Sequence, residues 1–326
     1  MHKLLSLNSP LSYPVIAPNG NIAVTSASGH ILELCETENG LSETKVILEL
    51  ETQANGMQFA ENGHIVLCDT SSQSLGLLNM TIFFSFKKII FNQIVLYSPT
   101  NSNKDNEMKE SQKVDTSYSY ERKVLCNEYE NISLKGPIAC TIDNYGRIYF
   151  TDGGVFGQSC ASVNASKLNG SVFMVANDGT LKVICYHSLT YPSDIICTKS
   201  REKNNKSDQD HALLYVTDLY CNRIWRFVEV SKNNHLFIGG VFFTFNGGLG
   251  PYGLTCDNQN NLYVARYEMK VTNNCGYISV INPSGKLIAE MDSLNIAPQL
   301  NGICFHPLNS QNKKKQDPQE NDSTEH

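Results

Sequence analysis

One short phrase recurs about six times along this chain of 326 residues, and it constrains the fold more than any other feature. Each copy has a small or Pro/Gly start, a mostly apolar stretch, a polar Asn/Gly turn and a second apolar stretch. The clearest copies are NGMQFAENGHIVLCD, GPIACTIDNYGRIYFTD and GPYGLTCDNQNNLYVAR, which start at Asn55, Gly136 and Gly250. Two strands joined by a turn, repeated at intervals of tens of residues, predict a radial repeat architecture.

The spacing of the copies predicts propeller blades. The copies start near Pro14, Asn55, Pro137, Pro192, Pro251 and Asn301, at spacings of 41, 82, 55, 59 and 50 residues. A four-stranded blade takes roughly 40–50 residues. Outer strands are visible in SVFMVANDGTLKVIC and YISVINPSGKLIAEM, where NDG and PSG are turn signals. No stretch has the long helical periodicity that an alternating strand–helix fold needs.

We therefore predict an all-β, six-bladed β-propeller over residues 1–308, with a last blade that shows only one evident strand, LNGICFHP. The polar run QNKKKQDPQENDSTEH predicts a disordered tail over residues 309–326. Because propellers commonly close by pairing strands from both ends of the chain, closure here needs the residues before Pro14 or stays imperfect.

The spacing of 82 residues indicates an insertion at about residues 79–117. It opens with the apolar MTIFFSFKKIIFNQIVLYS and continues as a polar run. Lys87 and Lys88 lie within the apolar part, which argues against a membrane span. Three hypotheses stay open: an additional hairpin with a disordered loop, a segment that docks a partner, and translated non-coding sequence.

Net charge and cysteine usage limit the classes of partner and the cellular compartment that we expect for this chain. A net charge of −6 does not favour phosphate backbones, so we expect no nucleic-acid partner. The 11 cysteines include no Cys-x-x-Cys pair, and several lie in apolar strands, as reduced buried thiols do. The opening MHKLLSLNSP has too short an apolar stretch for a signal peptide. These features predict a cytoplasmic protein without a membrane partner.

Three phrases carry a family resemblance: GRIYFTDGGVFG from Gly146, LLYVTDLYCNRIWRF from Leu213 and NLYVARYEMK from Asn261. Over roughly residues 14–307, apart from the insertion, the chain resembles the senescence marker protein/gluconolactonase (LRE-like) family of six-bladed propellers. It is also similar, to a lesser degree, to strictosidine-synthase-like propellers. The resemblance implies a Ca²⁺ ion at the channel mouth, held by a Glu, an Asn and an Asp at the starts of the first, fourth and fifth repeats. Such an ion would polarise a lactone carbonyl or activate water.

At the positions where the family keeps these ligands and a substrate-side Asn, the sequence has Ser12, Ser193, Tyr252 and Ile138. Neutral hydroxyls and an alkyl group are poor Ca²⁺ ligands. The sequence therefore favours a gluconolactonase-like propeller with a degenerate metal site, as a non-catalytic or ligand-binding member. The alternative is a metal-dependent lactone or ester hydrolase of the family type, and Ca²⁺ or another divalent cation is expected only in that case.

Other candidate residues complete the predicted site. Asn55 and Asn301 start the second and sixth repeats, where Asn-Gly is favourable turn chemistry and an Asn at the mouth could also bind substrate. With the four positions above, they form the predicted channel-mouth site for a small molecule. A further alternative is a metal-free enzyme like the strictosidine-synthase group, which needs an acidic residue in the channel. Asp194 and Glu268 are the candidates for that catalytic role, and Asp194 is also the candidate for holding a cation.

Three aspartates, Asp69, Asp152 and Asp218, end second strands at equivalent places in the repeats. We expect their carboxylates to accept backbone hydrogen bonds in the turn that follows.

Overall fold

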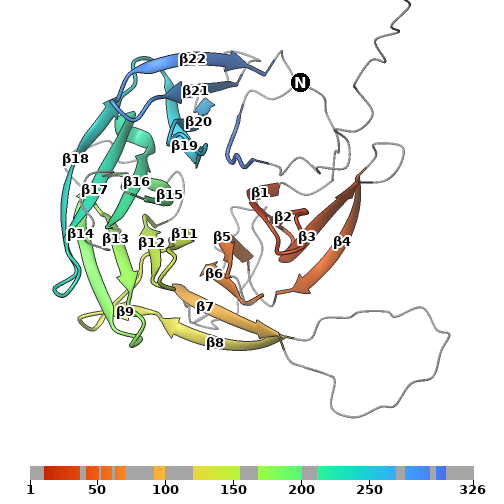
Figure 1. The fold of residues 1–326 in the computed structure, drawn as a ribbon. Helices are drawn as coiled ribbons and strands as arrows, with labels where there is room; N and C mark the ends of the chain where they lie inside the picture. The colour runs from red at the N-terminus through yellow and green to blue at the C-terminus, as the bar shows by residue number, and fades with distance from the viewer. Residues whose placement is uncertain are drawn as a thin grey trace, which may run out of the picture.

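The computed structural model describes residues 11–36, 42–50, 53–60, 63–70, 92–99, 120–154, 168–199, 211–268, 276–293 and 299–305. These residues fold into five four-stranded antiparallel sheets, arranged as blades around a central axis (Figure 1). Each blade takes four consecutive strands, and its first strand lies innermost. Among the described residues, no helix is long and apolar enough to cross a bilayer.

The first two blades hold the strands β1 (Leu11–Ile16), β2 (Ile22–Ser26), β3 (His30–Glu36), β4 (Ser42–Glu49), β5 (Gln53–Phe59), β6 (Ile65–Thr70), β7 (Asn92–Pro99) and β8 (Tyr120–Cys126). A two-stranded ribbon, β9 (Glu128–Tyr129) and β10 (Ile132–Ser133), leads to the third blade, which is formed by β11 (Pro137–Ile142), β12 (Ile148–Asp152), β13 (Gly170–Val175) and β14 (Leu181–Leu189).

The fourth blade is formed by β15 (Pro192–Lys199), β16 (Ala212–Asp218), β17 (Arg223–Ser231) and β18 (Leu236–Thr244), with a short 3₁₀ helix η1 (Leu219–Cys221) between β16 and β17. The fifth blade is formed by β19 (Leu249–Cys256), β20 (Leu262–Glu268), β21 (Tyr277–Ile281) and β22 (Leu287–Asp292).

Burial follows the position of a strand within its blade. The second and third strands are covered on both faces because blades pack face to face, so Tyr149 and Phe150 of β12 are fully buried. The outermost strand β22 is exposed along its whole length. Both turns expected between outer strands are present, with Gly179 and Gly285 at φ values of 82° and 81° that favour glycine. The strand pattern in the sequence therefore maps directly onto the blades.

The prediction of an all-β propeller is confirmed, but the described residues form five four-stranded blades rather than six. The gap between the fifth and first blades holds the segment 299–305 (Figure 1). This segment pairs with β20 through a single bridge between Gln299 and Tyr267. On its other side, Asn301 Nδ2 donates to the carbonyl of Leu11 at 3.3 Å. The seam of the ring is thus closed by one short segment.

The range interpreted as an insertion contains a strand of the second blade. β7 (Asn92–Pro99) pairs with β6 and β8 as the third strand of that blade, and its Ile94 and Val95 are fully buried. Its apolar residues fill a position that every blade needs, so the insertion hypotheses now concern only the neighbouring residues 79–91 and 100–117. Those residues, like the predicted tail at 309–326, lie outside the described residues.

The carboxylates at the ends of second strands bind the segment that leads into the innermost strand of the same blade. Asp152 accepts from the amides of Lys135 and Gly136 at 3.0 and 2.7 Å. Asp218 accepts from the amides of Thr190 and Tyr191. Backbone donors were expected for both, although these donors precede the blade instead of following the strand. Asp69 instead accepts from the side chains of Gln93 and Arg122.

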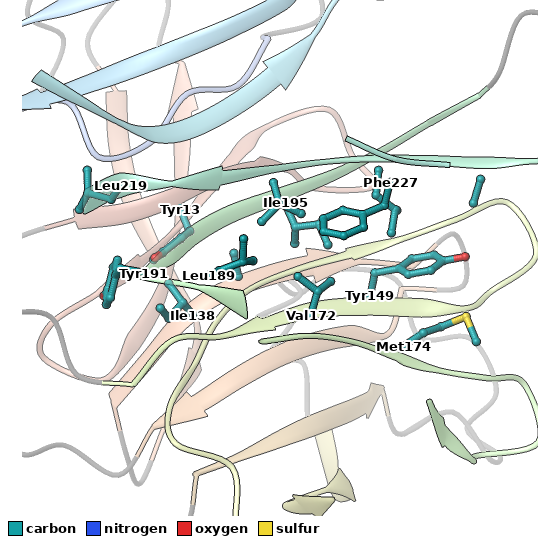
Figure 2. Close-up of a cluster of buried hydrophobic side chains, with 14 of the residues drawn as sticks. Tyr13, Ile138, Tyr149, Val172, Met174, Leu189, Tyr191, Ile195, Leu219 and Phe227 are labelled. Atoms are coloured by element: carbon teal, nitrogen blue, oxygen red, sulfur yellow. The ribbon is translucent and has the colours of Figure 1, made fainter. Parts of the chain in front are cut away.

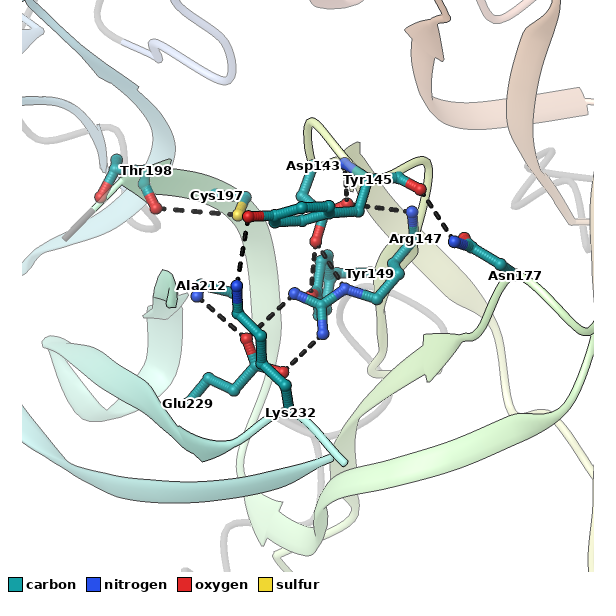
Figure 3. Close-up of polar contacts among 10 residues, drawn as sticks. All are labelled: Asp143, Tyr145, Arg147, Tyr149, Asn177, Cys197, Thr198, Ala212, Glu229 and Lys232. Carbon is teal, nitrogen blue, oxygen red and sulfur yellow. Dashed lines mark hydrogen bonds and ion pairs between the residues drawn. The ribbon is translucent and has the colours of Figure 1, made fainter. Parts of the chain in front are cut away.

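A buried ion-pair network joins the third and fourth blades (Figure 3). The Arg147 guanidinium bonds both carboxylate oxygens of Glu229, at 2.5 and 3.0 Å, and its Nε bonds Asp143 at 2.7 Å. The Tyr149 hydroxyl also donates to Asp143, and the amide of Ala212 donates to Glu229. One guanidinium therefore serves two carboxylates inside the blade interface, with the Tyr149 hydroxyl and the Ala212 amide as further donors.

Candidate functional site: a cavity at the centre of the ring

A cavity of ≈ 290 Å³ lies at the centre of the ring, lined by the inner strand of every blade and by the closing segment. The lining comprises residues 13–16, 56–58, 139–141, 194–196, 254–256 and 302–305. A volume near 300 Å³ is at the small end of ligand sites, which run from about 300 to 1,000 Å³. The cavity is therefore suited to a small molecule.

Tyr13 separates the cavity from a buried cluster that also contains Tyr191 and Ile138 (Figure 2). The Tyr13 hydroxyl donates to the carbonyl of Ser193 at 3.4 Å. Tyr252 is hydrogen-bonded to the hydroxyls of both Tyr13 and Tyr191. Burial raises the pKa of Tyr252 to about 12 and that of Tyr13 well above its usual value. These phenols stay protonated at neutral pH and act as a neutral hydrogen-bonded wall.

The structure places the six predicted channel-mouth residues at the starts of the inner strands and of the closing segment, but none of them lines the cavity. They are Ser12, Asn55, Ile138, Ser193, Tyr252 and Asn301. The polar ones bind the adjacent blade. Asn55 Nδ2 donates to the carbonyl of Pro137 at 3.0 Å, and Asn301 Nδ2 donates to Ser12 Oγ at 3.2 Å. These contacts tie the starts of neighbouring inner strands together.

Ser193 makes the densest of these contacts. It is fully buried, and its hydroxyl bonds the Thr217 hydroxyl at 2.8 Å and the carbonyl of Tyr252 at 3.1 Å. Ile138 is 1 % exposed and packs in the same cluster as Tyr13. Both residues are therefore occupied by packing between blades.

The cavity is lined instead by the residue that follows the predicted one in five of the six copies. These following residues are Tyr13, Gly56, Ala139, Asp194 and Gly302. A register irregularity lies at the start of every inner strand, between Ser12 and Val15 in β1 and near the equivalent place in β5, β11, β15 and β19. A β-bulge of this kind re-aims side chains near functional sites. A Pro among the first four residues of four of the five inner strands was the available sequence signal.

Asp194 is the cavity-lining carboxylate. Its Oδ1 accepts from the amide of Ile195 at 2.8 Å, and its Oδ2 accepts from the amide of Leu254, in the next blade, at 2.7 Å. Burial raises the pKa of Asp194 to about 7, although the two amides oppose this shift. The other acidic candidate, Glu268, ends β20, and its side chain lies outside the described residues. The structure therefore places Asp194 at the cavity.

This raised pKa predicts how stability depends on pH. Because folded Asp194 binds its proton more tightly than the unfolded chain does, its contribution to stability is present below pH ~4 and is lost as the pH rises to about 7. Replacing Asp194 with Asn should flatten the decline of melting temperature between pH 4 and 7. The matched control is Asp257→Asn, which removes another amide-bonded carboxylate, from the β19–β20 turn. An unchanged pH profile in Asp194→Asn would contradict the assignment.

The interpretation of Asn-Gly as turn chemistry is wrong for the second repeat. Asn55 and Gly56 lie inside β5, and Gly56 packs against the backbone of the next blade, where an added Cβ would come within 2.6 Å of the Ala139 Cα. The pair is required by close packing between blades. Gly302 likewise packs on the Pro14 ring, at 2.4 Å from an added Cβ.

Comparison with known proteins fits this geometry. The family model described as the SMP-30/Gluconolactonase/LRE-like region matches residues 139–307, which is more than half of the chain. The chain belongs to the SMP-30/gluconolactonase/LRE-like family. The matched range begins in β11 and includes the third, fourth and fifth blades and the closing segment. No curated protein matches the sequence at a significant level.

Solved structures of the SMP-30/gluconolactonase/LRE-like type share the fold. A gluconolactonase from Xanthomonas campestris is similar with a TM-score of 0.60 at 16 % identity, over 93 % of this chain and 81 % of that one. A luciferin-regenerating enzyme is similar with a TM-score of 0.59 at 12 % identity, over 91 % of this chain and 80 % of that one. At these identities the similarity establishes the propeller fold alone.

Proposed function

We propose that this chain is a gluconolactonase-like propeller that binds a small molecule in its central cavity without the family-type metal ion. The observation that carries the proposal is the use of Ser193. Its buried hydroxyl is engaged between the fourth and fifth blades, at the position where the resemblance requires an amide ligand. A Ca²⁺ ion needs several oxygen ligands at about 2.3–2.6 Å, preferably charged ones.

The donor set near the cavity does not fit such an ion. Ser12 and Tyr252 offer neutral hydroxyls, and Tyr252 is already hydrogen-bonded to two other phenols. Among the described residues, no group of three or more His, Cys, Asp or Glu side chains is arranged to hold a metal. The nearby carboxyl of Asp194 already accepts one amide on each oxygen. These donor groups are consistent with a protein that binds a ligand without a metal ion.

Metal removal tests the proposal. We expect calorimetric titration with Ca²⁺ to show no micromolar binding and the melting temperature to be the same with and without EDTA, because the charged ligands are missing. A catalytically active gluconolactonase of the family, treated in parallel, provides the positive control. Metal-dependent turnover of a lactone by this chain, with Ca²⁺, Zn²⁺ or Mn²⁺, would establish the hydrolase alternative instead.

Two structural points belong to the same proposal. We propose that the segment 299–305 is the inner strand of an incomplete sixth blade, because it completes the cavity lining beside the five inner strands. We also propose a cytoplasmic location, since the described cysteines are all free thiols, of which Cys68 and Cys140 are buried.

A further inference from the structure

Asp194 places a carboxyl group at the central cavity, and the propeller fold does not depend on the charge of that group. Its oxygens receive one backbone amide each, from Ile195 and Leu254, and none of the described residues that line the cavity is a lysine, arginine or histidine. Other carboxylates of the described residues have different surroundings. Asp152 and Asp218 are buried and also accept backbone amides, but they do not line the cavity. Glu229 and Asp143 bond Arg147, and Asp69 bonds Arg122. Asp194 differs from all of these carboxylates because it lines the cavity, where a ligand can reach it.

The other ionisable groups that face the cavity do not supply this partner. They are Tyr13 and the thiols of Cys140, Cys256 and Cys304. Burial raises the pKa of Tyr13 and Cys256, and that of Cys304 to about 11, so these groups are neutral near pH 7. Among the described lining residues, a cation in the cavity would therefore meet one carboxylate and no positively charged side chain.

The remaining wall suits the apolar part of a small ligand. Pro14, Val15, Met57, Ile195 and Leu254 line the cavity, together with the aromatic rings of Tyr13 and Phe305. Aromatic faces also attract cations, contributing about 0.5–2 kcal/mol according to desolvation. Gln58, Thr141 and Thr255 add polar groups, so the described wall combines apolar surface, aromatic rings, neutral polar side chains and one carboxyl group.

We propose that the cavity binds a small organic ammonium ion, a protonated primary amine with a short apolar chain, whose nitrogen pairs with the Asp194 carboxylate. This inference rests on the proposed function, because it names the chemical class of the ligand for the same cavity. It is distinct from the metal-dependent lactone chemistry that the resemblance implies. A single carboxylate with an apolar wall matches a monovalent ammonium group better than a divalent ion, which needs more oxygen ligands.

The test uses three probes of equal length: n-pentylamine, n-pentanol and pentanoate, titrated by calorimetry into the full chain at pH 7.5. We expect the amine to bind at least about tenfold more tightly than the alcohol, because a charge-assisted hydrogen bond exceeds a neutral one by roughly that factor. Pentanoate should bind least. Asp194→Asn should reduce amine affinity to that of the alcohol without changing alcohol affinity, while Asp257→Asn should change neither.

A second measurement on the unaltered protein guards against misfolding of the variant. At pH 6.5, in buffers of different ionisation enthalpy, amine binding should release a proton from Asp194, and alcohol binding should release none. Equal affinities for amine and alcohol, or amine binding without proton release, would overturn the ammonium inference and leave the cavity as a ligand site. If none of the three probes binds, the inference fails together with the proposed ligand-binding role.

Discussion

Replacing Arg147 with methionine is expected to destabilise the protein by about 3–5 kcal/mol, because it leaves buried carboxylates without their cation. The Arg147 side chain is 7 % exposed, that of Glu229 0 % and that of Asp143 6 %. Methionine keeps much of the packing volume, so the loss should report charge and hydrogen bonding. Denaturant unfolding of the two proteins measures the difference.

Two controls separate this effect from a general surface change. Lys232→Met removes a cation at the edge of this network, whose Nζ donates to the Tyr145 hydroxyl at 3.1 Å in an exposed contact, and should cost less than about 1 kcal/mol. Glu229→Gln combined with Arg147→Met should cost less than the sum of the single changes, since the two side chains are directly coupled. A loss under 1 kcal/mol for Arg147→Met would show that water reaches the network and replaces the guanidinium.

The same network predicts an acid limit. Burial by itself would raise the pKa of Glu229, but the bonds from Arg147 outweigh it and hold that pKa below the usual range. The stability from Glu229 is therefore complete above its unfolded pKa and is lost as the pH falls through the lower folded value. Asp194 acts in the opposite direction, so the two groups together favour a mildly acidic optimum.

Gly56→Ala should be the most damaging change of a single methyl group. The new Cβ would lie 2.6 Å from the Cα of Ala139 and 2.7 Å from the carbonyl oxygen of Ile138, both backbone atoms that cannot rotate away. Overpacking of this kind costs about 1–3 kcal/mol and more where backbone must move. We expect a loss of about 3 kcal/mol, measured by denaturant unfolding.

The matched control is Gly240→Ala in β18, where an added Cβ meets no atom within 4 Å. It should change stability by less than about 1 kcal/mol. Similar losses at both glycines would mean that chain entropy, and not the approach of the second and third blades, accounts for the effect at Gly56.

The sequence predicted where the strands lie better than it predicted which of their side chains face the cavity. Second strands such as those ending at Asp152 and Asp218 combine apolar runs with a terminal carboxylate, so their place in a blade follows from local pattern. The face of the sheet on which a side chain lies also follows from the local alternation along the strand, unless a β-bulge shifts that alternation. The bulges at Ser12–Val15 and its equivalents moved the cavity-facing position by one residue, which no periodicity in the sequence reveals.

Contacts between blades were beyond prediction because they join distant parts of the chain. Arg147 and Glu229 are 82 residues apart, and nothing in the repeat phrase that contains Arg147 points to Glu229 as its partner. Asn55 and Gly56 looked like a turn because the pair has that local preference, whereas the approach of the third blade determines their conformation. Asp194 could be named as a candidate, but its lack of a cationic partner depends on five other segments of the chain.

The seam between the first and fifth blades has a consequence for how the chain could be rearranged. Each four-stranded sheet is built from consecutive strands, so breaking the chain between two blades divides no sheet. At the seam, Asn301 is hydrogen-bonded to Leu11, which brings the two ends of the described ring together. A chain that is cut between the second and third blades and joined at its original ends would therefore keep each sheet whole. Such a circularly permuted chain, which starts at the third blade, retains every hydrogen-bonded ladder of the described residues.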